Sequence, residues 1–139
     1  NPPFYPVTGC RLPKNAEIAA AKTELFWDQA VLMAEAHFLL KESGRFSLIF
    51  DGARKSDMLE NAENAGLFLK SSRDIFAKAD KTGPTRVLLQ WGKKKTVFCE
   101  EAPLTIYDEN GAYTPEMKRI LENYHGTGTV SCGDSHRQS

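Results

Sequence analysis

Several features that mark particular classes of protein are missing from this sequence of 139 residues. A membrane-spanning helix needs roughly 18 consecutive apolar residues, whereas the longest apolar stretch here is interrupted by Glu35 and His37. Net charge is also missing, because 18 basic residues balance 18 acidic ones. Since strong nucleic-acid binding requires a basic surface, zero net charge argues against nucleic acid as a partner.

Cysteine is scarce, and its spacing excludes the common metal motifs. The three cysteines, Cys10, Cys99 and Cys132, form no Cys-x-x-Cys pair, so we expect no metal site. Cys10 and Cys132 bracket the chain and could form a disulfide that stabilises the fold by roughly 4–5 kcal/mol at most. In a reducing compartment all three would instead be free thiols.

An initiator methionine and a signal-peptide pattern are absent as well, so we expect a mature or excised fragment. Secretion, or delivery outside the producing cell, is favoured over a cytoplasmic location. Apolar residues make up 41% of the chain, which is enough for a hydrophobic core. The length suits a single domain over residues 1–139, with a proline-rich arm at 1–13 and a Gly/Ser-rich tail at 126–139.

Residues 15–42 are the longest periodic segment and predict a single long helix. Asn15 is a suitable N-cap and Gly44 a suitable C-terminal stop. At 100° per residue this helix has two apolar faces rather than one. The first face consists of Ile18, Leu25, Leu32, Met33, Ala36, Leu39 and Leu40, and the second of Trp27, Val31 and Phe38.

A line of acidic residues runs between these two faces: Glu17, Glu24, Asp28, Glu35 and Glu42. Three of them, Glu24, Asp28 and Glu35, lie beside the apolar side chains of Trp27, Val31 and Phe38. This combination predicts a docking surface for a basic protein partner or for a second copy of the chain. The alternative is a solvated ridge, with the aromatic side chains covered by the proline-rich arm or by a C-terminal helix.

The remaining segments predict an α+β fold. Short apolar runs predict strands at 45–51, 86–91, 96–100 and 104–107. A second helix is expected over residues 57–80, and Thr114 with Pro115 should begin a short C-terminal helix. We therefore expect the two longer helices to pack on a small, largely antiparallel or mixed sheet of about four strands.

Three consecutive lysines, Lys93, Lys94 and Lys95, follow the predicted strand 86–91 and would form the tip of a hairpin with strand 96–100. This cluster could contact phosphate or an acidic partner. It could equally be a solvated turn that keeps the sheet from pairing with other chains.

The order of several features resembles that of secreted fungal ribonucleases of the T1 type. Cys10 precedes the long helix, hairpin strands follow it, and His125 lies shortly before Cys132. The resemblance implies RNA cleavage, with Glu100 as base, Arg86 as phosphate clamp and His125 as acid. His125 also precedes a Gly-Thr-Gly-Thr stretch, whose backbone N–H groups could bind an anion. The alternative is an ordinary helix end followed by a glycine-rich tail.

No catalytic constellation in the sequence is complete. The leading hypothesis is therefore a small secreted or host-delivered effector-like domain that binds a protein partner, or itself, through residues 15–42. The alternative is a small toxin-like hydrolase centred on His125, and nucleic acid would be a partner only in that case. Neither hypothesis requires a cofactor.

Overall fold

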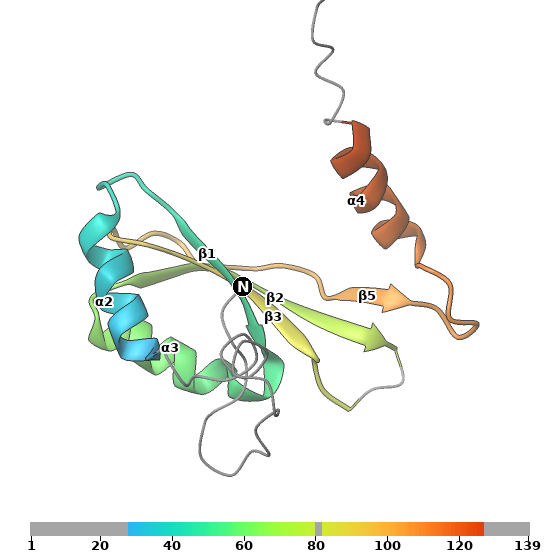
Figure 1. The fold of residues 1–139 in the computed structure, drawn as a ribbon, viewed down its shortest axis with the longest axis horizontal. Coiled ribbons are helices and arrows are strands. Elements are labelled where there is room, and N and C mark those ends of the chain that lie inside the picture. The colour runs from blue at the N-terminus through green and yellow to red at the C-terminus, as the bar shows by residue number, and fades with distance from the viewer. Residues whose placement is uncertain (1–27, 80–81, 127–139) are drawn as a thin grey trace, which may run out of the picture.

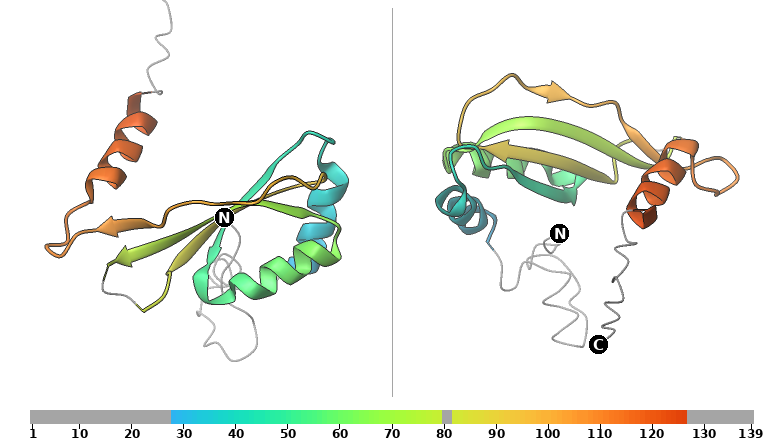
Figure 2. Two further views of the ribbon diagram at one scale, coloured as in Figure 1. Left: turned by 180° about the vertical axis from the view of Figure 1, so that it is seen from behind. Right: turned by 90° about the horizontal axis from the view of Figure 1, so that it is seen from above.

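The computed structural model describes residues 28–79 and 82–126, which form a five-stranded mixed sheet and three α-helices. Helices α2 (Gln29–Leu39) and α3 (Lys55–Asn64) lie on one face of the sheet, and α4 (Pro115–Gly126) lies beyond one end of it (Figures 1 and 2). The predicted α+β class and the mixed sheet are confirmed. None of the helices in the described ranges is long and apolar enough to span a membrane.

The sheet has the order β1-β3-β2-β4, with β5 also paired to β2. Its strands are β1 (Phe46–Asp51), β2 (Phe68–Lys78), β3 (Arg86–Gly92), β4 (Cys99–Glu100) and β5 (Leu104–Tyr107). Only β3 runs against its neighbours, because it is antiparallel to β1 and β2, whereas β4 and β5 are parallel to β2. The strands predicted at 45–51, 86–91 and 104–107 are therefore confirmed.

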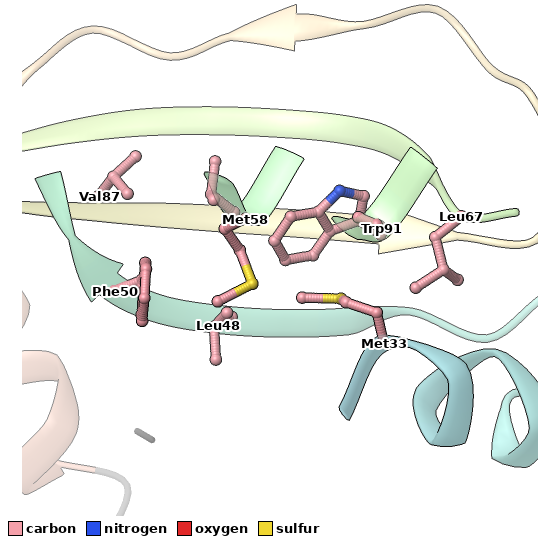
Figure 3. Packing of buried hydrophobic residues seen from close by; sticks show 9 residues of the cluster. Met33, Leu48, Phe50, Met58, Leu67, Val87 and Trp91 are labelled. Atoms are coloured by element: carbon pink, nitrogen blue, oxygen red, sulfur yellow. The ribbon is translucent and has the colours of Figure 1, made fainter. Parts of the chain in front are cut away.

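The core lies between the sheet and helices α2 and α3. Side chains alternate along β1 and β3, so that Leu48 opposes Leu89 on the buried face of the sheet. Met33 of α2 and Met58 of α3, both fully buried, point into the space over these strands (Figure 3). Each such side chain contributes roughly 1.5–3 kcal/mol through burial of apolar surface. The complete cluster is Met33, Leu48, Phe50, Met58, Ala62, Leu67, Val87, Leu89 and Trp91.

The single helix expected over residues 15–42 is wrong. Asp28 has extended backbone (φ −115°, ψ 125°) and acts as the N-cap of α2, with its Oδ1 accepting a hydrogen bond from the Ala30 N–H at 2.8 Å. The helix ends at Leu39, because Leu40 is again extended. An aspartate that caps a helix looks in sequence like one more acid on the helix surface, which explains the error. Residues 15–27 lie outside the described part of the chain.

The helix expected over residues 57–80 is confirmed only for its first part. A 3-10 turn, η1 (Gly52–Arg54), leads into α3, which stops at Asn64, and the chain then becomes strand β2. Gly66 causes the break, because its positive φ of 79° lets the Leu67 N–H bond back to the Ala62 carbonyl at 2.9 Å. Apolar residues after this turn fit a helical spacing, but pairing with β3 decides in favour of a strand.

The hairpin expected between 86–91 and 96–100 is also wrong. After β3 the chain crosses the end of β2 and returns as β4, where Cys99 pairs in parallel with Ser71. Residues 93–98 are therefore a crossing loop at the end of the sheet rather than a tight turn. The local sequence pattern could not predict this crossing, because strand pairing depends on residues that are far apart in the chain.

The C-terminal helix begins as predicted. Thr114 Oγ1 accepts the Met117 N–H at 3.3 Å and donates to the Thr105 carbonyl at 2.6 Å. This N-cap therefore also fixes the start of α4 against β5, the strand on which α4 packs. The Asp-Glu-Asn-Gly turn before it is also formed, with Asp108 Oδ1 accepting from the Asn110 and Ala112 N–H groups.

Candidate functional site

Three of the parallel strands end at one edge of the sheet. β1 ends at Asp51, which is opposite Arg86 at the start of β3, and β2 ends at Lys78, which is opposite Tyr107 at the end of β5. Sheets with helices packed on them commonly bind ligands beyond the carboxyl ends of their parallel strands. We therefore treat this carboxyl edge as the candidate site.

The β1 side of the carboxyl edge carries charged groups that already have partners. Asp51 Oδ1 accepts the Ala53 N–H at 3.1 Å, which caps η1. Arg54 lies over the Phe50 ring, with its guanidinium carbon 5.5 Å from the ring centroid. Lys55 Nζ donates to Asp74 Oδ1 at 3.0 Å, so this half-buried ion pair ties the start of α3 to β2.

The β5 side of the edge is more open. A shallow pocket is lined by Lys78 and Ala79 of β2 and its following turn, and by Asp108 and Glu109 after β5. Tyr107 and Tyr113 stack beside it with ring centroids 5.3 Å apart and an interplanar angle of 16°. This side of the edge can offer one cation, acidic groups and an aromatic surface to a ligand.

No three His, Cys, Asp or Glu side chains in residues 28–79 and 82–126 are grouped as metal ligands would be. The carboxylates of Asp51 and Asp74 serve a cap and an ion pair.

The three residues expected under the hydrolase alternative are not assembled into a site. Arg86 lies on β3, where its Nη1 donates to the Thr85 carbonyl at 2.7 Å. Glu100 is exposed on β4, and β2 separates it from β3. His125 falls in the last turn of α4, but its side chain lies outside the described part of the structure.

The ridge residues are only partly described. Asp28 is the N-cap of α2, and Glu35 and Val31 are exposed on that helix. Phe38 is 83% exposed, and Leu39, which was expected on the buried stripe, is 77% exposed. Glu24 and Trp27 lie outside the described residues, so a docking role for this surface stays a prediction.

The lysine cluster and the cysteines complete the predicted set. Lys94 and Lys95 are exposed and Lys93 is half-buried in the crossing loop. Cys99 is an exposed free thiol. Cys10 and Cys132 both lie outside the described residues, so the disulfide between them stays a prediction.

The sequence is similar to a group of RNA-modifying enzymes. It is 30% identical over 125 residues to the tRNA1(Val) (adenine(37)-N6)-methyltransferase of Trichodesmium erythraeum, a match that covers 90% of this chain and 51% of the relative. Enzymes of the same name from Histophilus somni and Glaesserella parasuis are 30% and 28% identical, again over 90% of this chain. The chain spans about half the length of the curated relatives it matches. No protein-family model matches it.

The fold is similar to part of a solved structure. The crystal structure of a predicted O-methyltransferase from Agrobacterium tumefaciens is similar, with a TM-score of 0.54 and 17% sequence identity over 70% of this chain and 46% of that chain. At this identity the similarity shows the fold alone. Because these relatives and the similar solved structure are all named as methyltransferases, the effector-like, secreted-toxin and hydrolase hypotheses are wrong. The compartment in which the protein acts is a separate question and stays a prediction.

The expectation that nucleic acid is an unlikely partner conflicts with relatives that are named for their action on tRNA. The expectation rested on the net charge of the whole chain. Net charge is a sum over the whole chain, whereas phosphate binding depends on the local density of cations on one surface. A chain with 18 basic and 18 acidic residues can still place several basic ones together on one part of its surface.

Proposed function

We propose that this chain is the substrate-binding part of an enzyme that methylates the N6 amino group of an adenine in RNA. The observation that carries the proposal is the similarity, over 90% of the chain, to enzymes named as tRNA adenine-N6 methyltransferases. The similarity of the fold to the Agrobacterium O-methyltransferase is compatible with this proposal but shows the fold alone. Since the chain spans half of each relative, it need not hold every part of the enzyme's machinery.

Within residues 28–79 and 82–126 no glycine-rich turn suits a site for the methyl donor. A nucleotide-like cofactor is usually held by a Gly-x-Gly-x-x-Gly turn between a strand and a helix, and the sequence contains no such motif. The one glycine that follows β1 directly, Gly52, is closed against Pro84, whose carbonyl oxygen occupies the space of a side chain there. We therefore assign donor binding to residues beyond those described.

The segment 1–5, Asn-Pro-Pro-Phe-Tyr, has the chemistry that an adenine amino group requires. A carboxamide oxygen such as that of Asn1 can accept a hydrogen bond from an exocyclic amine. Enzymes that modify a base take it out of the helix and hold it between aromatic or apolar side chains, and Phe4 and Tyr5 offer two such rings. The proline-rich composition of this segment had predicted only an extended arm.

The test is methyl transfer by the protein, expressed with any sequence that flanks this chain in its reading frame. The substrate is an unmodified transcript of the tRNA named for the relatives, and digestion with mass spectrometry should reveal N6-methyladenosine. Methylation at another atom, or no methylation, would contradict the proposal. Asn1→Ala and Phe4→Ala should each lower kcat/KM by about 100-fold, because misplacing a reacting group costs on that order. Asn110→Ala, in an exposed turn, should have no effect and serves as the matched control.

A further inference from the structure

The end of the sheet opposite the carboxyl edge gathers cations from three separate stretches of chain. The turn before β1, the start of β2 and the loop after β3 meet there, far from α4 (Figures 1 and 2). We call this surface the basic end and define it by its six cations. They are Lys41, Arg45, Lys70, Lys93, Lys94 and Lys95.

Register and packing bring these cations together. Phe46 pairs with Trp91, and Phe68 pairs with Gly92, so the three chain segments meet at Gly92. A side chain added at Gly92 would collide with the Lys70 chain and come within 3.2 Å of the Gly44 carbonyl. The strand register shifts at Lys70, and a bulge of this kind re-aims the side chain that it carries.

Acidic groups do not cancel this charge. Glu42, in the turn before β1, lies 4.0 Å from Lys94 Nζ, and both side chains are mostly exposed. Glu100 and Glu101, which follow Cys99 and lie beside Ser72 of β2, are two further exposed acids next to this surface. Six cations against these three acids leave a net positive surface on a chain whose formal net charge is zero.

Exposed aromatic side chains border the same surface. Phe98 follows the lysines in the crossing loop and is 47% exposed, and Phe68 at the start of β2 is 41% exposed. Cys99 pairs with Ser71, so Phe98 lies beside the Lys70 position of β2. Proteins bind single-stranded nucleic acid with cations that contact the phosphate backbone and with aromatic rings on which the bases stack.

We propose that the basic end binds the RNA substrate through its phosphates and unstacked bases, at the end of the sheet opposite the carboxyl edge. The inference rests on the proposed function, which supplies an RNA substrate, and it adds where that RNA is held. The seven residues of β3 separate this surface from the carboxyl edge by about 20 Å. A folded RNA spans that distance easily, and phosphate contacts position a substrate without reading its sequence.

The decisive variant is Lys94→Gln/Lys95→Gln, measured by tRNA affinity as a function of salt. Loss of two phosphate contacts should weaken binding by roughly tenfold and reduce the slope of log K against log salt by about 1.4–1.8. KM for tRNA should rise while kcat at saturating tRNA is unchanged. Lys94→Arg/Lys95→Arg should keep the wild-type slope, because the charge is retained.

A matched control removes two exposed cations from the other end of the molecule. Lys118→Gln/Arg119→Gln on α4 makes the same charge change, and its salt slope should equal that of the wild type. Equal losses in the two double variants would overturn the inference, since binding would then follow total charge. An unchanged slope in Lys94→Gln/Lys95→Gln would also overturn it and would leave an acidic protein as the ligand to test.

Phe98→Ala separates stacking from charge. Binding of a single-stranded oligonucleotide should weaken by roughly tenfold, and the salt slope should stay the same. Unchanged affinity would show that Phe98 does not contact the RNA.

The proposed function can fail separately from this inference. If tRNA binds with the expected salt response but no N6-methyladenosine forms, the function is wrong and the binding surface stands. If methylation occurs and the lysine variant behaves as wild type, only the inference is wrong.

Discussion

Arg73 on β2 and Glu116 in the first turn of α4 form an ion pair that ties this helix to the sheet. The Arg73 Nε also donates to the Ala102 carbonyl at 3.0 Å, so one guanidinium holds both the β4–β5 connection and the helix. Because α4 packs mainly on β5 and leaves Ile120 and Tyr124 exposed, this anchor carries much of its attachment.

Replacing Arg73 should therefore loosen α4 before it affects the core. We expect Arg73→Ala to lower the free energy of unfolding by about 1 kcal/mol and to speed amide exchange at the start of α4 by about fivefold. Glu116→Gln should cost less than about 0.5 kcal/mol, since the pair is partly exposed and the bond to Ala102 survives. Hydrogen exchange of residues 115–120 is the measurement. Wild-type exchange rates in both variants would show that the anchor is not needed.

Gly52 should be intolerant of any side chain. A methyl group there would collide with the carbonyl oxygen of Pro84, which is backbone and cannot move aside. We expect Gly52→Ala to destabilise the fold by about 1–3 kcal/mol, as overpacking does. Gly83→Ala is the matched control, because nothing lies within 4 Å of its added carbon, and it should stay within about 0.5 kcal/mol of the wild type. The urea midpoint of unfolding reports both, and equal midpoints would refute the steric argument.

The face that α2 buries can be tested with one pair of variants. Met33 is fully buried whereas Leu39, which the helical stripe had grouped with it, is largely exposed. We expect Met33→Ala to cost about 2–5 kcal/mol, through lost burial and the cavity left behind. Leu39→Ala should cost less than about 0.5 kcal/mol. Similar costs for the two variants, measured by thermal or urea unfolding, would mean that α2 packs in another orientation.

Thiol chemistry tests the remaining prediction about the cysteines. Cys99 is exposed and free, so it should react with a thiol reagent in the native protein. Under denaturing, non-reducing conditions a count of one reactive thiol would confirm a Cys10–Cys132 disulfide, whereas a count of three would exclude it. Bound tRNA should slow the reaction of Cys99, which adjoins the basic end in β4.

Local chemistry determined much of this protein from sequence alone. The apolar runs of β1, β3 and β5 are strands because each is short and apolar on the face it buries. Thr114 and Pro115 determine the start of α4, since a hydroxyl cap and a proline at the first position need no tertiary partner.

Only the tertiary structure decided where segments distant in the chain meet. Residues 68–78 became a strand because β3 offered a partner, and residues 93–98 cross to the far side of β2 rather than turning back. The same pairing gathers lysines from three segments at one end of the sheet, so that a chain of zero net charge presents a basic surface. Periodicity and net charge are properties of the chain in order, whereas strand partnership and charge density are properties of its arrangement in space.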